Sequence, residues 1–431
     1  MIKRFSLSTI FFSICFFSFA QSFQRLEKQF AVSSVLSQYY YGFALYDLNS
    51  SQVVFGKNQH HHFTPASNTK VFTLYESLTH LGDSLVGIEY IERGDSLYFW
   101  GTGDPTFLHP ELNTQKVFDF LKNSNKTLVY VPQETQEPTY REGWSIEDYD
   151  FYYQPEVSAF PIYGNVVHFE LNRGSVQIRP IYFRERIEWA PSSKATRISR
   201  SLRRNKYKIS GKMSNNYQTD KPFIYSDSLF VKLLADTLQR EVNLTTAPKP
   251  VDVKQLNSVS TREVLREMML PSDNFLAEHL QMSVAYQLFD SFHTKDFRMK
   301  MQKEYDDILP DKIQLRDASG LSIYNKITPA SMVELLQRIY KANKNEEEVL
   351  ELFPAGGIEG TLKGVYPLDQ NKPFVWAKTG TIHAVHAQSG FIKTKKGKMY
   401  AFSFLNNNYL GSSIPVRNEM VRIMTFIHDN F

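Results

Sequence analysis

The chain contains almost no cysteine: its 431 residues include a single one, Cys15. That residue lies inside an apolar stretch near the N-terminus, between Ile10 and Phe17. Disulfides, thiolate nucleophiles and cysteine-ligated metal sites all require cysteine. The rest of the chain therefore folds without disulfides and cannot use thiol chemistry.

Long apolar runs and a large net charge are also lacking. No segment after Phe17 reaches the roughly 20 apolar residues that a membrane-spanning helix needs. The formal charge is +4, and it falls to +2 once Lys3 and Arg4 are set aside. This balance gives no general argument for nucleic-acid binding. We expect neither a nucleic-acid partner nor a transmembrane span in the mature chain.

Residues 1–20 have the organisation of an export signal. Two basic residues precede the apolar stretch, and Ser18-Phe19-Ala20 places small residues where a signal peptidase reads them. Ile14 stands before Cys15, where a lipoprotein signal has a small residue, so we expect no lipid anchor. We therefore expect cleavage before Gln21 and a periplasmic mature protein.

The length of the chain and the pattern of its apolar residues indicate an inserted domain. A chain of 431 residues is too long for one ordinary hydrophobic core. Between residues 85 and 250, short apolar alternations such as Leu128–Val131 and Val166–Leu171 are separated by turn signals. We therefore expect a strand-rich inserted domain over 85–250, and a larger domain made of residues 21–84 and 251–431.

The pattern of the larger domain predicts an α+β fold. Two strands, Tyr41–Leu48 and Gln52–Phe55, are predicted before a helix that runs from Ser67 to about Leu81. Three more strands are predicted near the C-terminus, followed by a helix over Val416–Phe426. These three strands lie at Phe374–Gly380, Ser389–Ile392 and Met399–Phe404. The pattern predicts a five-stranded antiparallel sheet with flanking helices.

A basic run lies in the inserted region. It consists of Arg197, Arg200, Arg203, Arg204, Lys206 and Lys208. The run favours a solvated hairpin, and a binding face for an anionic partner is the alternative.

Ser67 and Lys70 form the pattern Ser-x-x-Lys. Residues three positions apart lie on the same side of a helix, one turn from each other. If the helix begins at Ser67, the hydroxyl lies at its positive end and the ammonium one turn behind. The pair then resembles a nucleophile with an adjacent base. Taken alone, the pattern is a weak signal, because it occurs by chance in most chains of this length and is also typical of a capped surface helix.

Two further motifs support the interpretation of Ser67 and Lys70 as a nucleophile and its base. Ser272-Asp273-Asn274 follows Pro271 between two helical patterns, and Lys378-Thr379-Gly380-Thr381 lies on a predicted strand. Ser-x-x-Lys, Ser-Asp-Asn and Lys-Thr-Gly occur together in class A β-lactamases and penicillin-binding proteins. All three occur here in that order, each in a suitable structural context, so coincidence is far less probable than for any single motif.

The spacing separates the members of this superfamily. Ser67 and Ser272 are 205 positions apart, far more than in a class A β-lactamase. With its long insertion, the chain resembles the class C low-molecular-mass penicillin-binding proteins, the D-alanyl-D-alanine carboxypeptidase/endopeptidase (DacB-type) family. The runs that carry this resemblance are Pro65–Lys70, Gly101–Pro105, Gly143–Trp144, Ser272–Glu278, Asp317–Ser322 and Gly357–Leu362.

The resemblance implies a serine β-lactamase/transpeptidase-like fold and acyl-enzyme chemistry. Ser67 would attack the carbonyl, and Lys70 would take its proton, which requires a pKa below the ordinary ~10.4. Burial and the nearby cation Lys378 would both lower that pKa. Ser272 would relay the proton toward the leaving amine. Asn274 would hydrogen-bond the substrate amide and the Lys70 side chain.

The strand motif would bind the substrate. Lys378 and Thr379 would hold the terminal D-Ala carboxylate, and Gly380 would leave room for substrate beside the strand. The backbone N–H groups of Ser67 and Thr381 would form the oxyanion hole. Three further residues, Asp273, Asp317 and Ser319, are expected to shape their loops. The chemistry needs no metal or organic cofactor.

Three functions remain to be weighed on the sequence. The first is a serine D-Ala-D-Ala carboxypeptidase, with possible endopeptidase activity, that acts on peptidoglycan stem peptides and is acylated by β-lactams. The second is a β-lactamase, but no Glu-x-x-Leu-Asn run follows Ser272 to supply a deacylating glutamate. The third is a non-catalytic wall-peptide binding protein, which would have no use for a nucleophile–base pair.

Overall fold

The computed structural model describes residues 21–112, 115–135, 137–172, 175–212 and 216–431. The expected signal peptide, residues 1–20, lies outside the described residues. Within the described ranges, no helix combines the length and the apolar character needed to cross a membrane.

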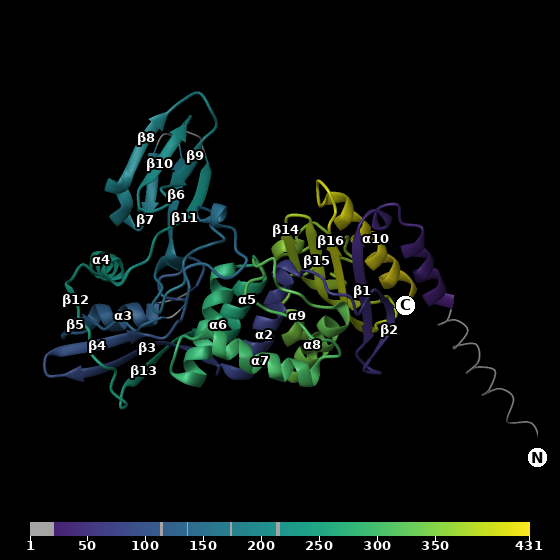
Figure 1. Cartoon of the computed structure of the whole chain (residues 1–431), viewed down its shortest axis with the longest axis horizontal. Coiled ribbons are helices and arrows are strands. Elements are labelled where there is room, and N and C mark those ends of the chain that lie inside the picture. The colour runs from purple at the N-terminus through teal and green to yellow at the C-terminus, as the bar shows by residue number, and fades with distance from the viewer. Residues whose placement is uncertain (1–20, 113–114, 136, 173–174, 213–215) are drawn as a thin grey trace, which may run out of the picture.

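The larger half of the molecule contains a five-stranded antiparallel sheet with helices beside it (Figure 1). Its order is β14-β15-β16-β1-β2, so two N-terminal strands complete a C-terminal meander, as predicted. The strands are β1 (Tyr40–Asp47), β2 (Gln52–Lys57), β14 (Val375–Ile382), β15 (Val385–Lys393) and β16 (Met399–Asn407). In the register of β1 and β16, Phe43 is paired with Phe404.

The sheet is buried on both faces, because alternate side chains enter different cores. Phe43 and Phe404 pack with α10 (Ile414–Asn430) and with the helical residues 21–31. Ala44 and Leu405 face the other way, toward α2 (Lys70–His80) and α8 (Pro329–Ala342). Helices thus cover both faces of the sheet.

Helix α6 (Asn274–Phe289) packs against α2 and is the most deeply buried helix of this half. Residues 275–286 of α6 are all buried, so this helix has no solvent-facing side over three turns. Helices α5 (Thr261–Met269) and α7 (Thr294–Ile308) pack against it, whereas α9 (Glu346–Leu350) packs against α8. At the start of α8, the Thr328 hydroxyl accepts the backbone N–H of Ser331, and Pro329 occupies the first turn.

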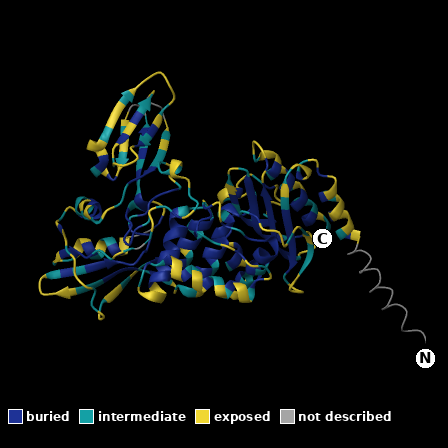
Figure 2. Cartoon of the chain, in the orientation of Figure 1, coloured by how far each residue is buried: buried dark blue, intermediate teal, exposed yellow. Residues whose placement is uncertain are grey.

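The inserted region is rich in strands, as expected from its alternating sequence. One five-stranded sheet, in the order β12-β5-β4-β3-β13, packs against α3 and α4. Two three-stranded sheets, β11-β6-β7 and β8-β10-β9, extend beyond it at the upper left of Figure 1. We call these two small sheets, residues 166–222, the outer module. Figure 2 shows that it carries many exposed residues, whereas burial is concentrated in the larger half.

The elements of this region are the following: β3 (Ser84–Arg93), β4 (Ser96–Gly101), α3 (Gln115–Asn123), β5 (Thr127–Tyr130), β6 (Val166–Asn172), β7 (Ser175–Arg179), β8 (Ile187–Pro191), β9 (Arg197–Arg200), β10 (Tyr207–Gly211), β11 (Tyr217–Pro222), α4 (Asp227–Leu238), β12 (Val242–Leu244) and β13 (Lys254–Ser260). Strand β13 pairs with β3, so this sheet continues beyond residue 250, where the inserted domain was expected to end. The division into domains remains a proposal, and this pairing favours a boundary near residue 260.

Candidate active site

Ser67 lies in a short 3-10 turn, Ala66–Thr69, that leads directly into α2. The sequence predicted an α-helix from Ser67 itself, whereas α2 begins at Lys70. The first turn is a 3-10 turn and not an α-helical one, so residues three positions apart lie directly above each other. Nζ of Lys70 lies 3.2 Å from Oγ of Ser67, so the expected pairing of hydroxyl and amine is present.

The Lys70 side chain is fully buried and surrounded by oxygen acceptors. Its Nζ donates to the side-chain oxygen of Asn274 at 2.6 Å and to the backbone carbonyl of Ser319 at 2.7 Å. Together with Ser67, these contacts fix the amine from three separate chain segments. The Asn274 contact was predicted, and the Ser319 contact was not.

Burial lowers the pKa of Lys70 to about 8. The charges of Asp273, Asp317 and Glu278 oppose this effect and raise the pKa. Burial, and then the charge of Lys70, also lower the pKa of Lys378 well below its ordinary value. The two amines therefore lie in one dry region and repel each other, which favours a neutral amine at moderately alkaline pH.

The Ser-Asp-Asn motif forms the turn between α5 and α6. The side chain of Asp273 accepts the backbone N–H of Leu276 at 2.8 Å and so caps α6, which is the structural role expected for it. Ser272 has a φ of +70°, in the left-handed region that residues other than glycine seldom adopt. Asn274 also donates to the carbonyl of Tyr153 in the inserted region at 2.9 Å.

The Lys-Thr-Gly-Thr motif lies on β14, at the edge of the five-stranded sheet. A Cβ on Gly380 would lie 2.6 Å from the carbonyl oxygen of Pro65 and 2.8 Å from the nitrogen of Ser67. Gly380 therefore lets the Ser67 turn approach the strand, and its expected role of leaving room for substrate stays a prediction. The Thr379 hydroxyl lies 2.7 Å from that of Thr361, and both residues line the cleft.

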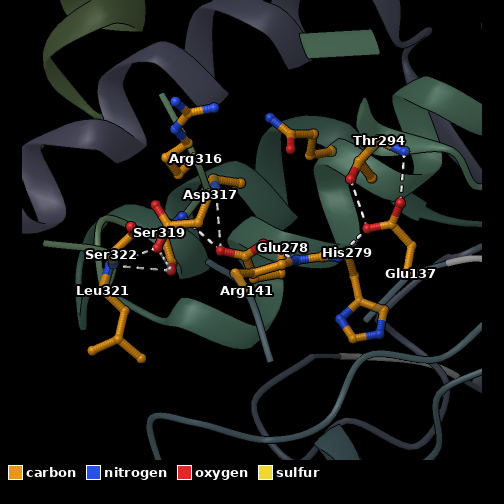
Figure 3. A network of polar contacts seen from close by, with 12 residues as sticks. Glu137, Arg141, Glu278, His279, Thr294, Arg316, Asp317, Ser319, Leu321 and Ser322 are labelled. Atoms are coloured by element: carbon orange, nitrogen blue, oxygen red, sulfur yellow. Dashed lines mark hydrogen bonds and ion pairs between the residues drawn. The ribbon is translucent and has the colours of Figure 1, made fainter. Parts of the chain in front are cut away.

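The loop Asp317–Ser322 closes the other side of the Ser67 turn. Gly320 has a φ of +85°, and a Cβ there would lie 1.9 Å from the carbonyl oxygen of Ala66. The Asp317 carboxylate accepts the backbone N–H groups of Gly320 and Ser322 at 2.9 and 2.6 Å. Asp317 thus shapes this loop, as the sequence predicted (Figure 3).

A cleft of about 520 Å³ brings the motifs together. Ser67, Ser272, Asn274, Thr379 and Thr381 all line it. Lys70 and Lys378 are buried beneath this surface, at 0% exposure.

The inserted region contributes cleft residues that the sequence did not reveal. Asp148, Tyr152 and Tyr153 line the same cleft as Ser67. Tyr152 is 64% exposed, an unusual position for a large aromatic side chain. Burial, followed by the charge of Asp148 and a hydrogen bond with it, raises the pKa of the Tyr153 hydroxyl to about 12. The only sequence signal was the aromatic run Tyr149–Tyr153, which has no motif spacing.

Comparison with protein families identifies one model, described as the D-Ala-D-Ala carboxypeptidase 3 (S13) family, which matches residues 23–427. The D-alanyl-D-alanine carboxypeptidase DacB of Haemophilus influenzae is 24% identical over 432 residues, covering 89% of each chain. The D-alanyl-D-alanine carboxypeptidase of Actinomadura sp. (strain R39) is 24% identical over 423 residues, covering 86% of this chain and 78% of the relative.

Solved structures share the fold. Penicillin binding protein 4 (dacB) from Haemophilus influenzae superposes with a TM-score of 0.75 at 21% identity, covering 94% of this chain and 99% of that one. Its complex with a β-lactam superposes with a TM-score of 0.68 at 20% identity and the same coverage. The expected penicillin-binding fold is thereby confirmed, including the inserted region.

Proposed function

The chain belongs to the D-Ala-D-Ala carboxypeptidase 3 (S13) family, and we propose that it removes the terminal D-Ala from peptidoglycan stem peptides through an acyl-enzyme on Ser67. The observation that carries this proposal is the 3.2 Å contact between the Ser67 hydroxyl and a buried lysine amine. Burial lowers the pKa of that Lys70 amine to about 8, so a useful fraction is neutral near pH 7 to 8.

Acylation follows from this geometry. Neutral Lys70 accepts the Ser67 proton as the hydroxyl oxygen bonds to the carbonyl carbon of the penultimate D-Ala. The negative charge on the carbonyl oxygen is stabilised by the backbone N–H groups of Ser67 and Thr381, which we assign as the oxyanion hole. The C–N bond then breaks, and the leaving amine receives a proton through Ser272. Free D-Ala departs, and the shortened peptide remains esterified to Ser67.

Deacylation repeats these steps with water. A water molecule loses its proton to the same amine and attacks the ester carbonyl, and the Ser67 oxygen leaves and regains a proton. Asn274 holds Lys70 in place throughout, because its side-chain oxygen lies 2.6 Å from Nζ. The net reaction consumes one water and releases D-Ala, with no change in the enzyme.

We assign substrate binding to residues of β14, of α6 and of the inserted region. Lys378 and Thr379 on β14 bind the terminal carboxylate, and Asn274 binds the peptide amide. Asp148 and the exposed ring of Tyr152 line the same cleft from the inserted region. An acidic group there suits the amino group of a diamino acid in the stem peptide, as in meso-diaminopimelate cross-links. This feature favours endopeptidase activity as a second reaction of the same site.

β-Lactams are proposed to acylate the same serine, since the solved relative has been captured with a β-lactam. We further propose that the mature enzyme begins at Gln21 and acts in the periplasm, where its polymeric substrate lies. N-terminal sequencing of the exported protein tests this location, and a retained leader or a lipid on Cys15 would contradict it.

The decisive experiment is incubation of the purified protein with pentapeptide and cross-linked muropeptides, followed by mass analysis of the products. Loss of one alanine identifies the carboxypeptidase, and conversion of dimers to monomers identifies the endopeptidase. A β-lactam label that is shed within seconds would favour a β-lactamase. The absence of both products and of any covalent β-lactam label would leave only peptide binding.

A further inference from the structure

A chain of buried contacts connects the inserted region to the Lys70 amine. Nζ of Lys70 donates to the carbonyl of Ser319 at 2.7 Å. The backbone N–H groups of Ser319 and Ala318 donate to one carboxylate oxygen of Glu278, at 2.9 and 3.1 Å. The other oxygen of Glu278 accepts from Nε of Arg141 at 3.1 Å (Figure 3). Three contacts thus separate Arg141 from the amine.

Both charged groups are removed from water. The side chains of Arg141 and Glu278 are 2% and 1% exposed. The guanidinium also pairs with Glu137, whose carboxylate accepts the backbone N–H of Thr294 at 2.8 Å, at the start of α7. A buried ion pair is costly to form and is destabilising when one partner is removed. Its presence here therefore calls for a reason other than stability.

We propose that Glu278 and Arg141 are positioning residues for the reaction, which hold the Ser319 carbonyl against the amine of Lys70. The inserted region thereby sets the orientation of the base as well as covering the cleft. The inference rests on the proposed function, because Lys70 has to be the proton acceptor for its orientation to matter. Glu278 lies one turn after Asn274 on α6. This helix therefore contacts Lys70 directly through Asn274 and indirectly through Glu278 and the Ser319 carbonyl.

The charges around Lys70 allow the proposed role of Glu278 to be tested through the pKa of the Lys70 amine. Asp273, Glu278 and Asp317 face it from the motif turn, from α6 and from the loop, and all three raise its pKa. Lys378 faces it from β14, and the two amines repel each other. Glu278 is itself paired with Arg141. Replacing Glu278 by glutamine removes one of the three nearby negative charges, so the pKa of Lys70 falls.

A second ion pair provides a matched control. Lys249 pairs with Glu89 at 2.9 Å and donates to the Tyr286 hydroxyl at 2.6 Å. Like Arg141, Lys249 fastens the inserted region to α6, about two turns further along that helix. Its partners Glu89, Tyr286 and Asp290 do not belong to the Asp317–Ser322 loop. A variant at Lys249 therefore tests only the attachment of the inserted region to α6, without changing the contacts of the Asp317–Ser322 loop.

The test compares Glu278→Gln, Arg141→Met, their double variant, Arg141→Lys and the control Lys249→Met in the mature chain. For each we measure kcat and KM for D-Ala release from a soluble pentapeptide between pH 6 and 10, together with the thermal midpoint. A misplaced base costs about 10- to 100-fold in kcat, with KM little changed. The double variant should be no slower than the slower single variant, because both act through one carbonyl. Arg141→Lys should recover part of the rate.

The pH profile separates positioning from simple stability. Glu278→Gln should move the acid limb of kcat to lower pH, and Lys249→Met should leave that limb at the wild-type position. The proposal is overturned if Glu278→Gln keeps the wild-type kcat and profile, or if Lys249→Met loses as much kcat as Arg141→Met. Should Glu278→Gln not fold, the contrast between Arg141→Lys, Arg141→Met and Lys249→Met decides the question. Failure of the proposed function is distinct, since the wild-type chain would then release no D-Ala.

Discussion

Nζ of Lys70 and Oγ of Ser67 are 3.2 Å apart, although the two residues belong to different kinds of helix. The 3-10 turn places them one above the other, whereas an ideal α-helix would offset them by part of a turn. Gly380 and Gly320 allow β14 and the Asp317–Ser322 loop to approach this turn from two sides. The nucleophile and its base are thus fixed before substrate arrives.

The first prediction concerns the nucleophile. Ser67→Ala should abolish the covalent adduct with a β-lactam, because the other two oxygens that contact Nζ of Lys70, from Asn274 and Ser319, belong to amide groups and are not nucleophiles. The fold should be kept, since the change removes a single oxygen atom. Intact-mass measurement after incubation with penicillin is the test, and Ser50→Ala on an exposed turn is the control. An adduct that persists in Ser67→Ala would refute the assignment.

The second prediction concerns pH. Lys70 can accept the Ser67 proton only when neutral, and burial lowers its pKa to about 8. The rate of acylation should therefore rise with pH, increase about tenfold per unit below this value and level off above it. Stopped-flow acylation by a chromogenic β-lactam between pH 6 and 10 measures the profile. A rate that is constant from pH 6 to 9 would mean that another group accepts the proton.

Much of the larger half could be predicted from the sequence. Its strands alternate or are uniformly apolar, its helices have clear caps such as Thr328, and the three motifs occur in a fixed order. Local rules are sufficient for these features, because each depends on residues only a few positions apart. The pairing of Ser67 with Lys70 is itself such a short-range relationship.

The features that were missed are long-range. Arg141 and Glu278 are 137 positions apart, and no periodicity links a residue of the inserted region to a helix face of the other half. Asp148 and Tyr152 reach the cleft only because the inserted region folds over it. The role of Gly380 depends on which backbone segment packs against β14, which the strand pattern does not reveal.

The third prediction concerns stability. Glu76 on α2 is fully buried, and burial raises its pKa to about 7 from 4.5. Because the native-state pKa lies above the unfolded value, the native state holds the proton more tightly, and stability is lost as pH rises from 4.5 to 7. Glu76→Gln removes this loss and keeps an oxygen for the Tyr305 hydroxyl, which donates at 2.8 Å.

The stability of Glu76→Gln relative to the parent should therefore increase by on the order of 2 kcal/mol between pH 4.5 and pH 8. Urea unfolding at both pH values measures this difference. Glu263→Gln, at an exposed position on α5, should give no such change. Equal stability differences at the two pH values would mean that Glu76 is already ionised in the native state.

The fourth prediction concerns the outer module. Residues 166–222 contain 13 arginines and lysines and 4 acidic residues, a formal charge of +9, whereas the whole chain carries +4. Arg203, Arg204 and Lys206 are exposed on one loop of this module. Such a field attracts polyanions over a distance set by the ionic strength. Stem peptides that end in carboxylates make peptidoglycan a polyanion.

Replacing these three residues by glutamine should weaken sedimentation of the protein with purified sacculi at low salt, and the difference should disappear at high salt. Turnover of a soluble pentapeptide should stay within about twofold of the parent, because the loop is distinct from the residues that line the cleft. Lys395→Gln with Lys396→Gln, on an exposed turn of the other half, is the control. Unchanged binding at low salt would mean that the basic run is simply a solvated surface.

The last prediction concerns selectivity for the stem peptide. Asp148 lines the cleft from the inserted region, and we expect its carboxylate to meet an amino group several atoms from the scissile bond. Remote contacts of this kind orient the reacting bond, so their loss lowers turnover as well as affinity. Asp148→Asn should reduce kcat/KM about tenfold for a D-Ala-D-Ala peptide with a free side-chain amine, and should leave the acetylated peptide unchanged. Asp150→Asn is the matched control, because Asp150 pairs with Lys221 at 3.3 Å instead of lining the cleft. Equal values for the two peptides in the wild-type enzyme would show that the inserted region does not select this end of the substrate.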